Sequence, residues 1–583
     1  MNQKLPRPEH PRPQMERGDW ENLNGSWEFA FDFSASGKER RMFCEGTFDR
    51  TITVPFCPES ALSGIGYKDF MPAVWYRRQI VLSEQQLSGR VLLHFGAVDY
   101  EAEVWVNGES VGVHRGGFSS FTFDITRAAR AGENTIVVCA LDDVRSGRQP
   151  SGKQSARYHH YECFYTRTTG IWQTVWLEFV PKTYIRSYRL IPDPANGQAH
   201  FEVCLGGEPH CDELTLTASF EGRPAGSVTV KTCGRSAAVS LPLSETHLWE
   251  PGAPALYDLT LSLASGDRVR SYFGLRTIEW RDKAMYLNGK IVFQRLILDQ
   301  GFFPDGIYTA SSDEALRRDI ELSMALGFNG ARMHEKIFEE RYLYWADKLG
   351  YLVWGEMANW GLDITTAAGL ENFLPEWVEA MERDFNHAAL IGWCPFNETW
   401  DWRQTGARQD DSVLSAVYQV TKALDPTRPV IDTSGNFHVV TDIYDIHWYE
   451  QEPERFRAAF AEAFQKGSVV DNHSDRQRYD GQPYFVSEYG GTWWNPKDAS
   501  RENWGYGMRP DSEEEVLRRY VGLTSALMER PEICAFCYTQ LTDVEQEQNG
   551  LYTYTREKKF SDETYRKIRE TNLAVAAIER RNA

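Results

Sequence analysis

Short runs in which hydrophobic and polar residues alternate fill the first part of the chain. The alternation has the period of two that is typical of half-buried strands, and helical periodicity is nearly absent as far as residue 181. Asn107-Gly108 is a strong hairpin signal after one of these runs. The pattern predicts a jelly-roll β-sandwich over residues 1–181, with strands that include residues 90–95, 102–106, 118–124 and 134–141.

A second stretch of predicted strands covers residues 182–277. Its alternating runs are separated by proline and glycine turns, and it holds no group of residues that suggests chemistry. A stretch of about a hundred residues made of short strands predicts an immunoglobulin-like β-sandwich. Its clearest strands are residues 213–220, 227–230 and 257–263.

After residue 277 the pattern changes, and short hydrophobic strands alternate with amphipathic helices. Residues 291–298 predict a strand, and residues 313–326 predict a helix that is entered through Ser311-Ser312. The unit repeats often enough to predict a C-terminal (β/α)8 TIM barrel over residues 278–583. Enzymes with this fold place their chemistry at the C-terminal ends of the barrel strands.

Two of the predicted barrel strands end on a glutamate. Hydrophobic residues 390–394 lead to Asn397-Glu398, and residues 483–487 lead to Glu488 and two glycines. Two strand-terminal carboxyl groups in one barrel predict a glycosidase, in which one group attacks the sugar and the other protonates the leaving oxygen. The alternative is that each glutamate caps a helix or forms a structural ion pair.

Composition narrows the choice of function. The net charge of −20 argues against electrostatic binding of nucleic acid. The 19 Trp, 27 Tyr and 31 Phe suit a carbohydrate enzyme, in which aromatic rings stack on sugars, although a sandwich core would also use many of them. The 10 cysteines are scattered, and the Cys-x-x-Cys of Cys534 and Cys537 lies in a hydrophobic run, so we expect buried thiols there.

Several motifs resemble those of the family 2 glycoside hydrolases, the family of bacterial β-galactosidases, β-glucuronidases and β-mannosidases. They are Thr169-Gly-Ile-Trp-Gln-Thr-Val-Trp176, Gly327-Phe-Asn-Gly-Ala-Arg332, Leu349-Gly-Tyr-Leu-Val-Trp-Gly-Glu356, Asn397-Glu398 and Ser487-Glu488. The resemblance runs along nearly the whole chain and implies a three-domain enzyme. It also implies that Glu398 is the acid/base, which has to carry a proton near neutral pH, and that Glu488 is the nucleophile.

The resemblance extends to residues around the two acids. It implies that Arg332 lies near the nucleophile, that Asn397 donates a hydrogen bond to the 2-hydroxyl of the substrate, and that Tyr449 hydrogen bonds to the nucleophile. An ordinary salt bridge is the alternative for Arg332, and an aromatic position in the barrel wall is the alternative for Tyr449.

Further substrate contacts are expected from both parts of the chain. In the first domain, Asp142 resembles the acidic residue that the family lends to the sugar site, and Asp143 fits the spacing equally well. In the barrel, the remaining candidates for substrate binding are His334, Trp400 and Tyr538.

Departures from the family pattern bear on the sugar and on metals. The glucuronidase-type Asn-x-Lys is missing, because Asn549 is followed by Gly550-Leu551. A buried uronic carboxylate without such a partner would cost several kcal/mol. The Glu-x-His that holds magnesium in some galactosidases is also missing after Glu356. We therefore predict a neutral terminal sugar, with no metal and no cofactor.

The sequence thus predicts a retaining exo-β-glycosidase that removes a terminal neutral sugar, with a β-galactoside favoured. One alternative is a β-glucuronidase, β-mannosidase or other glycosidase of the same family, since Lys497, Arg501 and Arg509 follow the nucleophile strand and leave room for a different cationic site. Another is a non-catalytic carbohydrate-binding protein, against which the two intact acids argue.

The expected partner is a glycoside or oligosaccharide rather than nucleic acid or a membrane, and a homo-oligomer stays open. The N-terminal residues show no signal peptide, and the chain shows no membrane span, so we expect a cytoplasmic protein.

Overall fold

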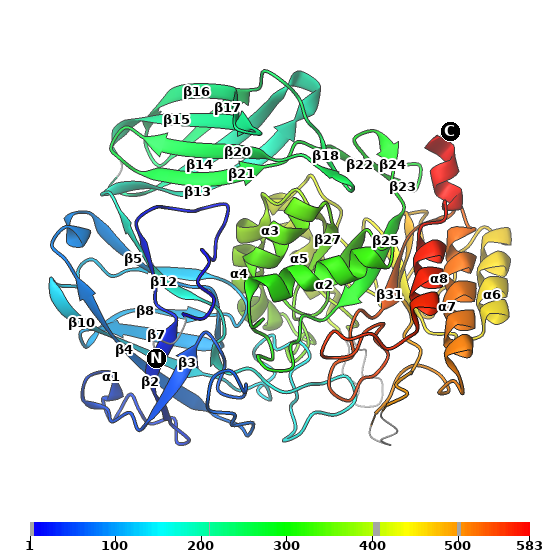
Figure 1. The fold of residues 1–583 in the computed structure, drawn as a ribbon, viewed down its shortest axis with the longest axis horizontal. Coiled ribbons are helices and arrows are strands. Elements are labelled where there is room, and N and C mark those ends of the chain that lie inside the picture. The colour runs from blue at the N-terminus through cyan, green and yellow to red at the C-terminus, as the bar shows by residue number, and fades with distance from the viewer. Residues whose placement is uncertain (1–4, 209, 400–408, 498–502, 583) are drawn as a thin grey trace.

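The computed structural model of the protein describes residues 5–208, 210–399, 409–497 and 503–582. Figure 1 shows a β-sandwich at the N-terminal end, a second sandwich above it and a helix-covered barrel beside both. The predicted combination of a jelly-roll sandwich, an immunoglobulin-like sandwich and a C-terminal TIM barrel is confirmed.

The first sandwich consists of two facing antiparallel sheets, ordered β1-β12-β5-β9 and β3-β2-β4-β10-β7-β8, and a short pair β11-β6. Alternate residues of the strands are buried between the sheets, as with Ile136, Val138 and Ala140 of β10. Its elements are β1 (Trp20–Asn22), β2 (Gly25–Phe31), α1 (Met42–Glu45), β3 (Arg50–Val54), β4 (Ala73–Leu82), η1 (Gln86–Ser88), β5 (Arg90–Phe95), β6 (Val98–Asp99), β7 (Glu101–Val106), β8 (Glu109–Arg115), β9 (Phe121–Asp124), β10 (Gly132–Leu141), β11 (Gly170–Ile171) and β12 (Val175–Val180).

The second sandwich pairs the sheet β13-β14-β17 with the sheet β16-β15-β20-β21. Leu214, Leu216 and Ala218 of β15 lie in its core, two residues apart, as the alternation requires. Its elements are β13 (Thr183–Asp193), η2 (Pro194–Asn196), β14 (Gln198–Gly207), β15 (Cys211–Phe220), β16 (Arg223–Cys233), β17 (Ser236–Pro242), β18 (Trp249–Glu250), β19 (Ala253–Pro254), β20 (Tyr257–Leu263) and β21 (Arg268–Phe273).

The barrel is built on a curled parallel sheet ordered β28-β27-β26-β25-β31-β30-β29. Parallel bridges join Trp393 to Val430 and Asn397 to Ser434, so the segment before β29 lies along the free edge of β28. The sequence pattern predicted a strand at residues 429–431, and the structure has these bridges in its place.

The elements of the barrel domain begin with a small antiparallel sheet and continue as alternating strands and helices. They are β22 (Ile278–Arg281), β23 (Ala284–Leu287), β24 (Lys290–Ile291), β25 (Gln294–Asp299), α2 (Asp313–Ala325), β26 (Gly330–Met333), α3 (Glu340–Leu349), β27 (Leu352–Glu356), α4 (Gly369–Asp384), β28 (Leu390–Cys394), α5 (Asp411–Leu424), β29 (Tyr444–Trp448), α6 (Pro453–Gln465), β30 (Tyr484–Gly490), α7 (Glu513–Met528), β31 (Ile533–Thr539), α8 (Asp562–Asn572) and η3 (Ala577–Asn582).

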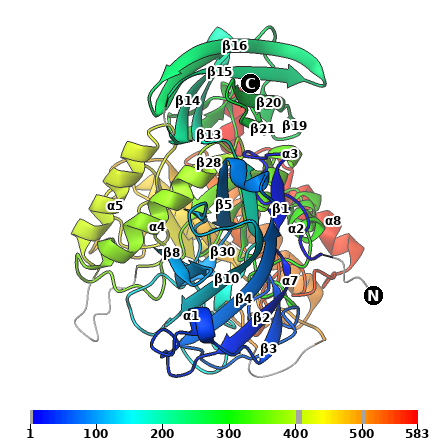
Figure 2. The same cartoon turned by 90° about the vertical axis from the view of Figure 1, so that its left-hand side faces the viewer.

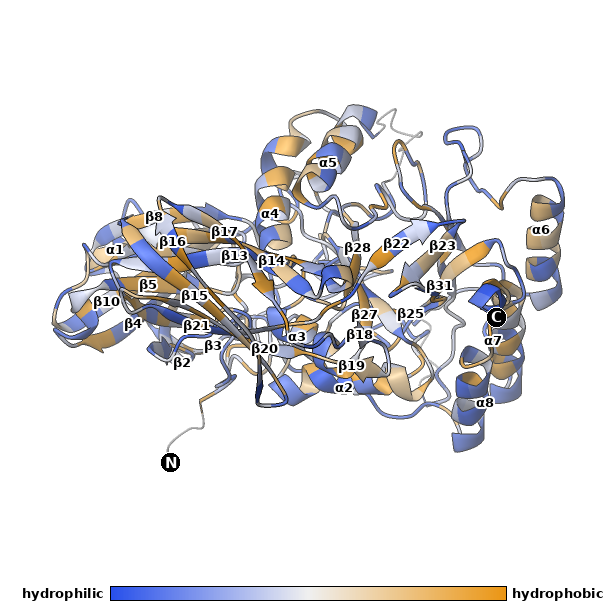
Figure 3. Cartoon of the chain, turned by 90° about the horizontal axis from the view of Figure 1, so that it is seen from above, coloured by the Kyte–Doolittle hydropathy of each residue, from blue (hydrophilic) through white to orange (hydrophobic). Residues whose placement is uncertain are grey.

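Hydrophobic burial and helix caps explain why these segments fold as they do. Figure 3 shows hydrophobic stretches along the strands, whereas the outer helices mix hydrophobic and polar residues. Ser312, Ser512 and Ser561 cap α2, α7 and α8 by accepting a backbone hydrogen bond at each N-terminus. Many tryptophans are core residues, because Trp354, Trp377 and others are fully buried.

The first sandwich packs directly against the barrel. His114 of β8 lies 2.9 Å from Glu379 of α4, and Phe118 N donates to Glu376 on the same helix. Figure 2 shows α4 beside β8 at this contact. Residues 142–169, which connect β10 to β11 and which we name the sandwich loop, also reach the barrel. No helix in the described ranges is long and hydrophobic enough to cross a membrane.

Candidate active site

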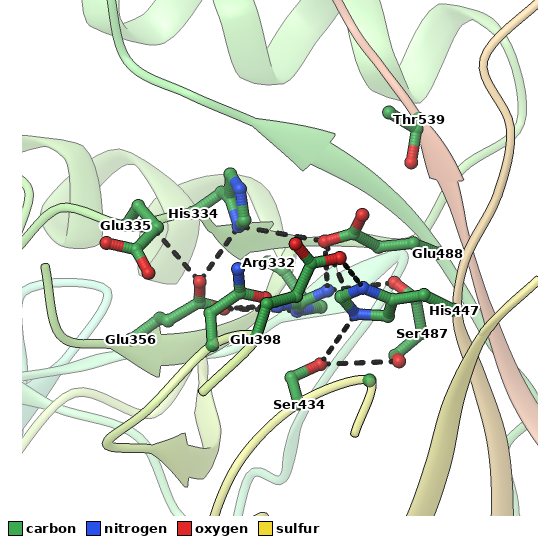
Figure 4. Close-up of polar contacts among 12 residues, drawn as sticks. Arg332, His334, Glu335, Glu356, Glu398, Ser434, His447, Ser487, Glu488 and Thr539 are labelled. Atoms are coloured by element: carbon green, nitrogen blue, oxygen red, sulfur yellow. Dashed lines mark hydrogen bonds and ion pairs between the residues drawn. The ribbon is translucent and has the colours of Figure 1, made fainter. Parts of the chain in front are cut away.

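The two strand-terminal glutamates lie close together at the C-terminal ends of the barrel strands. Glu398 follows β28 and has a left-handed backbone conformation (φ 42°), and Glu488 lies within β30. His447 of β29 lies between them. One carboxylate oxygen of each glutamate and one nitrogen of His447 all lie within 4.8 Å of one another (Figure 4).

Glu488 is held by groups that favour its ionised form. Arg332 Nη1 donates to Glu488 Oε1 at 3.1 Å, and the hydroxyl of Tyr449 donates to Oε2. Burial alone would raise the pKa of Glu488, but the positive charges of His447 and the Arg332 guanidinium outweigh it and lower the pKa to about 2. Glu488 is therefore a carboxylate at any physiological pH, as an attacking nucleophile must be.

Arg332 also binds a second buried acid, Glu356 at the end of β27. Its Nε and Nη2 donate to Glu356 Oε2 at 3.1 and 2.7 Å. On the other oxygen, Glu356 Oε1 accepts from Glu335 N at 3.0 Å and lies 2.8 Å from His334 Nδ1. Burial and, to a smaller extent, the positive charge of Lys153 lower the pKa of His334 well below its usual value. The ring is therefore neutral, and its Nδ1–H donates to Glu356. Glu356 thus fixes both Arg332 and His334.

Glu398 contacts His447 and is less buried than Glu488. His447 Nδ1 lies 2.6 Å from Glu398 Oε1, while His447 Nε2 lies 3.4 Å from Glu488 Oε1 and 3.1 Å from Ser434 Oγ. Burial lowers the pKa of His447, but the charges of Glu488 and Glu398 outweigh it and raise the pKa. The imidazole therefore connects the two acids.

Asn397, which precedes Glu398, is fixed by side chains from the loop after β27. Asn397 N donates to Asn359 Oδ1 at 2.7 Å, and Trp360 Nε1 donates to Asn397 O at 3.0 Å. Arg332 Nη2 donates to Asn397 Oδ1 at 3.1 Å, which orients the amide so that its NH2 group is left for another acceptor. We name Arg332, His334, Glu356, Asn397, Glu398, His447, Tyr449 and Glu488 the strand-end cluster.

The structure brings only some of the sequence-predicted residues into this cluster. Arg332, His334, Asn397 and Tyr449 join the two glutamates there. Trp400 lies outside the described residues. The role of each stays a prediction.

Two further candidates lie apart from the cluster. The ring of Tyr538 packs against Tyr489 and against Tyr520 of α7, so it points toward the helix layer. Asp142 accepts hydrogen bonds from Gln149 Nε2 at 2.7 Å and Thr169 Oγ1 at 3.0 Å within the sandwich loop. Asp143 caps a turn by accepting from Arg145 N.

Residues that the sequence patterns did not single out also belong to the site. They are His447, which lies two residues before Tyr449, and Lys153 of the sandwich loop. Lys153 influences the pKa of Glu488 and His334, so its charge lies near the cluster. A buried lysine in a loop of another domain leaves no periodic signal in the sequence.

Among the residues that the structure describes, one group of side chains has ligand atoms close enough to hold a metal ion. It consists of Glu398, His447 and Glu488. An imidazole nitrogen and two carboxylate oxygens would suit a divalent transition metal. In this structure, however, the same atoms already bind one another, Arg332 and Tyr449.

Comparison with known proteins matches most of the chain to one family. The model for the sugar binding domain of glycosyl hydrolases family 2 matches residues 20–178, a second model of that family matches residues 183–276, and its TIM barrel domain matches residues 278–506. The matched regions follow one another with short gaps.

Individual relatives are distant. A β-galactosidase from Thermoanaerobacter pseudethanolicus is 26% identical over 435 residues, covering 70% of this chain and 54% of that enzyme. A β-glucuronidase from Sus scrofa is 26% identical over 470 residues, covering 72% of this chain and 69% of that enzyme. The chain spans about half the length of the first curated relatives it matches, 44% of one from Formosa agariphila and 54% of the Thermoanaerobacter enzyme.

Solved structures share the fold along the full chain. A β-glucuronidase from Ruminococcus gnavus in complex with D-glucuronic acid superposes with a TM-score of 0.78 at 18% identity, covering 96% of this chain and 99% of that one. Together with the three consecutive domain models, this establishes that the chain belongs to family 2 of the glycosyl hydrolases.

Proposed function

We propose that this protein is a retaining exo-β-glycosidase that works by double displacement. The observation that carries the proposal is the closeness of the two acids, with carboxylate oxygens of Glu398 and Glu488 within 4.8 Å of each other. Retaining glycosidases have carboxyl groups about 5–5.5 Å apart, whereas inverting enzymes leave about 6.5–9.5 Å for a water molecule.

Glu488 is the proposed nucleophile. Its pKa of about 2 keeps it ionised, and Arg332 and Tyr449 hold its two oxygens. Both oxygens are therefore oriented before a substrate arrives, so little reorganisation accompanies attack on the anomeric carbon. The attack forms a glycosyl–Glu488 ester and releases the aglycone oxygen.

Glu398 is the proposed acid/base. It protonates the departing oxygen in the first step and removes a proton from the attacking water in the second. His447 Nδ1 at 2.6 Å holds the Glu398 carboxyl in position. Because the two glutamates raise the pKa of His447, its ring keeps a proton to higher pH than a free imidazole would.

The proposed substrate is a β-linked terminal uronic acid. The relatives and solved structures to which the chain is similar are mostly β-glucuronidases, which favours the β-glucuronidase alternative over a galactosidase. The galactose preference expected from the sequence has no such support. Both alternatives share the same chemistry at Glu398 and Glu488. They differ in the sugar, because a glucuronide and a galactoside have opposite configurations at C4 and different groups at C6.

The test of the proposed function is hydrolysis of nitrophenyl β-glycosides by the wild type and by Glu488→Ala. We expect Glu488→Ala to lose turnover by about 10⁴-fold or more, because no other group can form the covalent intermediate. Added azide should restore some release of nitrophenol and give the α-glycosyl azide, by attack on the face that Glu488 leaves open.

The control for this test is Glu557→Ala, which removes an exposed carboxylate and should retain full activity. A wild-type protein that binds sugars but hydrolyses no nitrophenyl glycoside would instead support the non-catalytic carbohydrate-binding alternative.

A further inference from the structure

Lys153 is a buried cation that the first sandwich brings to the strand-end cluster. Its side chain is 7% exposed, and Nζ lies 5.4 Å from the ring centre of Trp360. Burial would lower the pKa of this ammonium, but the charges of Glu547, Glu488 and Glu398 contribute to raising it above its usual value. Lys153 therefore keeps its positive charge close to both proposed catalytic acids.

Backbone hydrogen bonds fix the sandwich loop against the barrel beside Lys153. Ser151 N and Gly152 N donate to Trp360 O at 2.7 and 3.1 Å, and Gly152 N also lies 3.2 Å from Ala358 O. These contacts determine where the lysine side chain begins. Its four-carbon stem can then place the ammonium in the site from a different domain.

The Lys153 ammonium has donors available, whereas Arg332 has none. The Arg332 N–H groups are directed to the carboxylates of Glu356 and Glu488, to the carbonyl of Ser487 and to the amide of Asn397. Within the described ranges, no hydrogen bond or ion pair within 4.0 Å engages the ammonium of Lys153. A buried charge without a partner is unfavourable, so an anionic group of a ligand would be bound strongly there.

The cationic residues after the nucleophile strand do not occupy this position. The side chain of Lys497 is exposed. Arg509 Nη2 donates to Asn495 O at 2.6 Å, and its guanidinium lies 5.4 Å from the centre of the Trp493 ring. Arg501 lies outside the described residues.

We infer that Lys153 determines substrate specificity, by binding the carboxylate of a terminal uronic acid. The inference rests on the proposed glycosidase function and adds the residue that recognises the acidic sugar. A uronate bound here meets the negative charges of Glu398, Glu488 and Glu547, so it needs a nearby cation with free donors. An ammonium is a compact charge on a flexible stem and can follow the carboxylate at the edge of the sugar ring.

The experiment compares kcat/KM for nitrophenyl β-D-glucuronide and β-D-galacturonide with kcat/KM for the matching glucoside and galactoside. The variants are Lys153→Met, which keeps the length of the side chain without its charge, Lys153→Arg, and the exposed control Lys497→Met. We expect the wild type to prefer one uronide over its neutral counterpart by about 100-fold or more. Lys153→Met should lose that preference while the neutral rates change by less than about threefold, and Lys497→Met should match the wild type.

Two results would overturn the inference while leaving the glycosidase function intact. One is a wild type that hydrolyses a neutral glycoside faster than both uronides. The other is a Lys153→Met variant that slows uronides and neutral glycosides equally, because Lys153 would then act through the glutamates. If no glycoside is hydrolysed at all, the proposed function itself fails.

A second measurement needs no variant and therefore does not depend on how Lys153→Met folds. Calorimetric titration of the wild type with D-glucuronate and with D-glucose should show binding of the uronate about tenfold tighter or more. Equal affinities for the two sugars would count against the role of Lys153. Lys153→Arg, which retains the charge, should keep part of the preference for uronides.

Discussion

The strand-end cluster and the sandwich loop both bury charged groups at the same site, but they treat them differently. In the cluster, Arg332 spans two carboxylates, and Glu488 has a partner on each oxygen. In the loop, Lys153 has no hydrogen-bonding partner among the residues that the structure describes. The proposed catalytic groups are thus fixed in advance, whereas the residue that we propose selects the substrate keeps its donors free.

The sandwich loop itself contains the opposite arrangement only a few residues away. Asp142 is bound by Gln149 and Thr169, and burial raises its pKa to about 6. Asp142 is therefore occupied with holding the loop together, whereas Lys153 keeps its donors free. The loop thus combines a structural charge at Asp142 with the charge at Lys153 that we propose binds the ligand.

Replacing Glu398 by alanine should give the largest effect among these variants. General acid catalysis contributes about 10²–10⁴-fold, so glycosides with poor leaving groups should slow by that factor. Nitrophenyl glycosides need little protonation and should slow far less in the first step. Steady-state kinetics with alkyl and nitrophenyl glycosides of the same sugar measure the difference.

Product analysis provides the control for Glu398→Ala. Azide should accelerate the second step and give the β-glycosyl azide, because Glu488 still forms the covalent intermediate. If Glu398→Ala gave the α-azide and Glu488→Ala the β-azide, the two roles would be exchanged.

Replacing His447 by glutamine should have a smaller effect that depends on pH. The charge of His447 contributes most to lowering the pKa of Glu488, so the loss of His447 should raise that pKa. The nucleophile would then become protonated at a higher pH, and the acid limb of kcat/KM should move upward. We also expect kcat to fall by about 10–100-fold, because Glu398 loses the contact that positions it.

A pH profile distinguishes this role of His447 from a purely structural one. A destabilised but otherwise normal site would lower kcat at every pH without moving the acid limb. His200→Gln in the second sandwich is the matched control, because it removes a histidine that contacts Ser240 of the same sandwich and should leave the profile unchanged.

The sequence was sufficient to predict the architecture, because each domain shows a regular pattern of hydrophobic and polar residues. The alternation in β10 and β15 and the strand–helix repeat after residue 277 each follow from which residues are buried. The segment at residues 429–434 was less predictable. It contributes parallel bridges to β28 at Trp393 and Asn397 rather than an assigned strand, since one edge of the curled sheet ends there.

The site was predictable where it lies at strand ends and unpredictable where it depends on contacts between domains. Glu398, Glu488, Arg332 and Tyr449 follow or end barrel strands, so their convergence follows from the fold. Lys153 reaches the site only because its loop docks on the backbone of Trp360. The missing Asn-x-Lys predicted a neutral sugar. A cation that another domain contributes, as we propose for Lys153, has no fixed spacing from the barrel motifs, so the sequence pattern does not reveal it.

Gly152→Ala should give the smallest effect and tests the docking of the sandwich loop directly. Gly152 has φ +55°, and a Cβ there would lie 2.4 Å from Glu335 O and 3.2 Å from the Cβ of Ala358. The loop must therefore move away from the barrel and carry Lys153 with it.

Gly147→Ala is the matched control, since that glycine has φ +70° but an added Cβ would meet only Asp363, at 3.7 Å. Both variants add backbone strain of about 1–3 kcal/mol, so their losses of thermal stability should be similar. Only Gly152→Ala should raise KM for the uronide, by about tenfold, with kcat for a neutral glycoside nearly unchanged. Equal KM values for the two variants would show that the position of the loop does not control binding of the sugar.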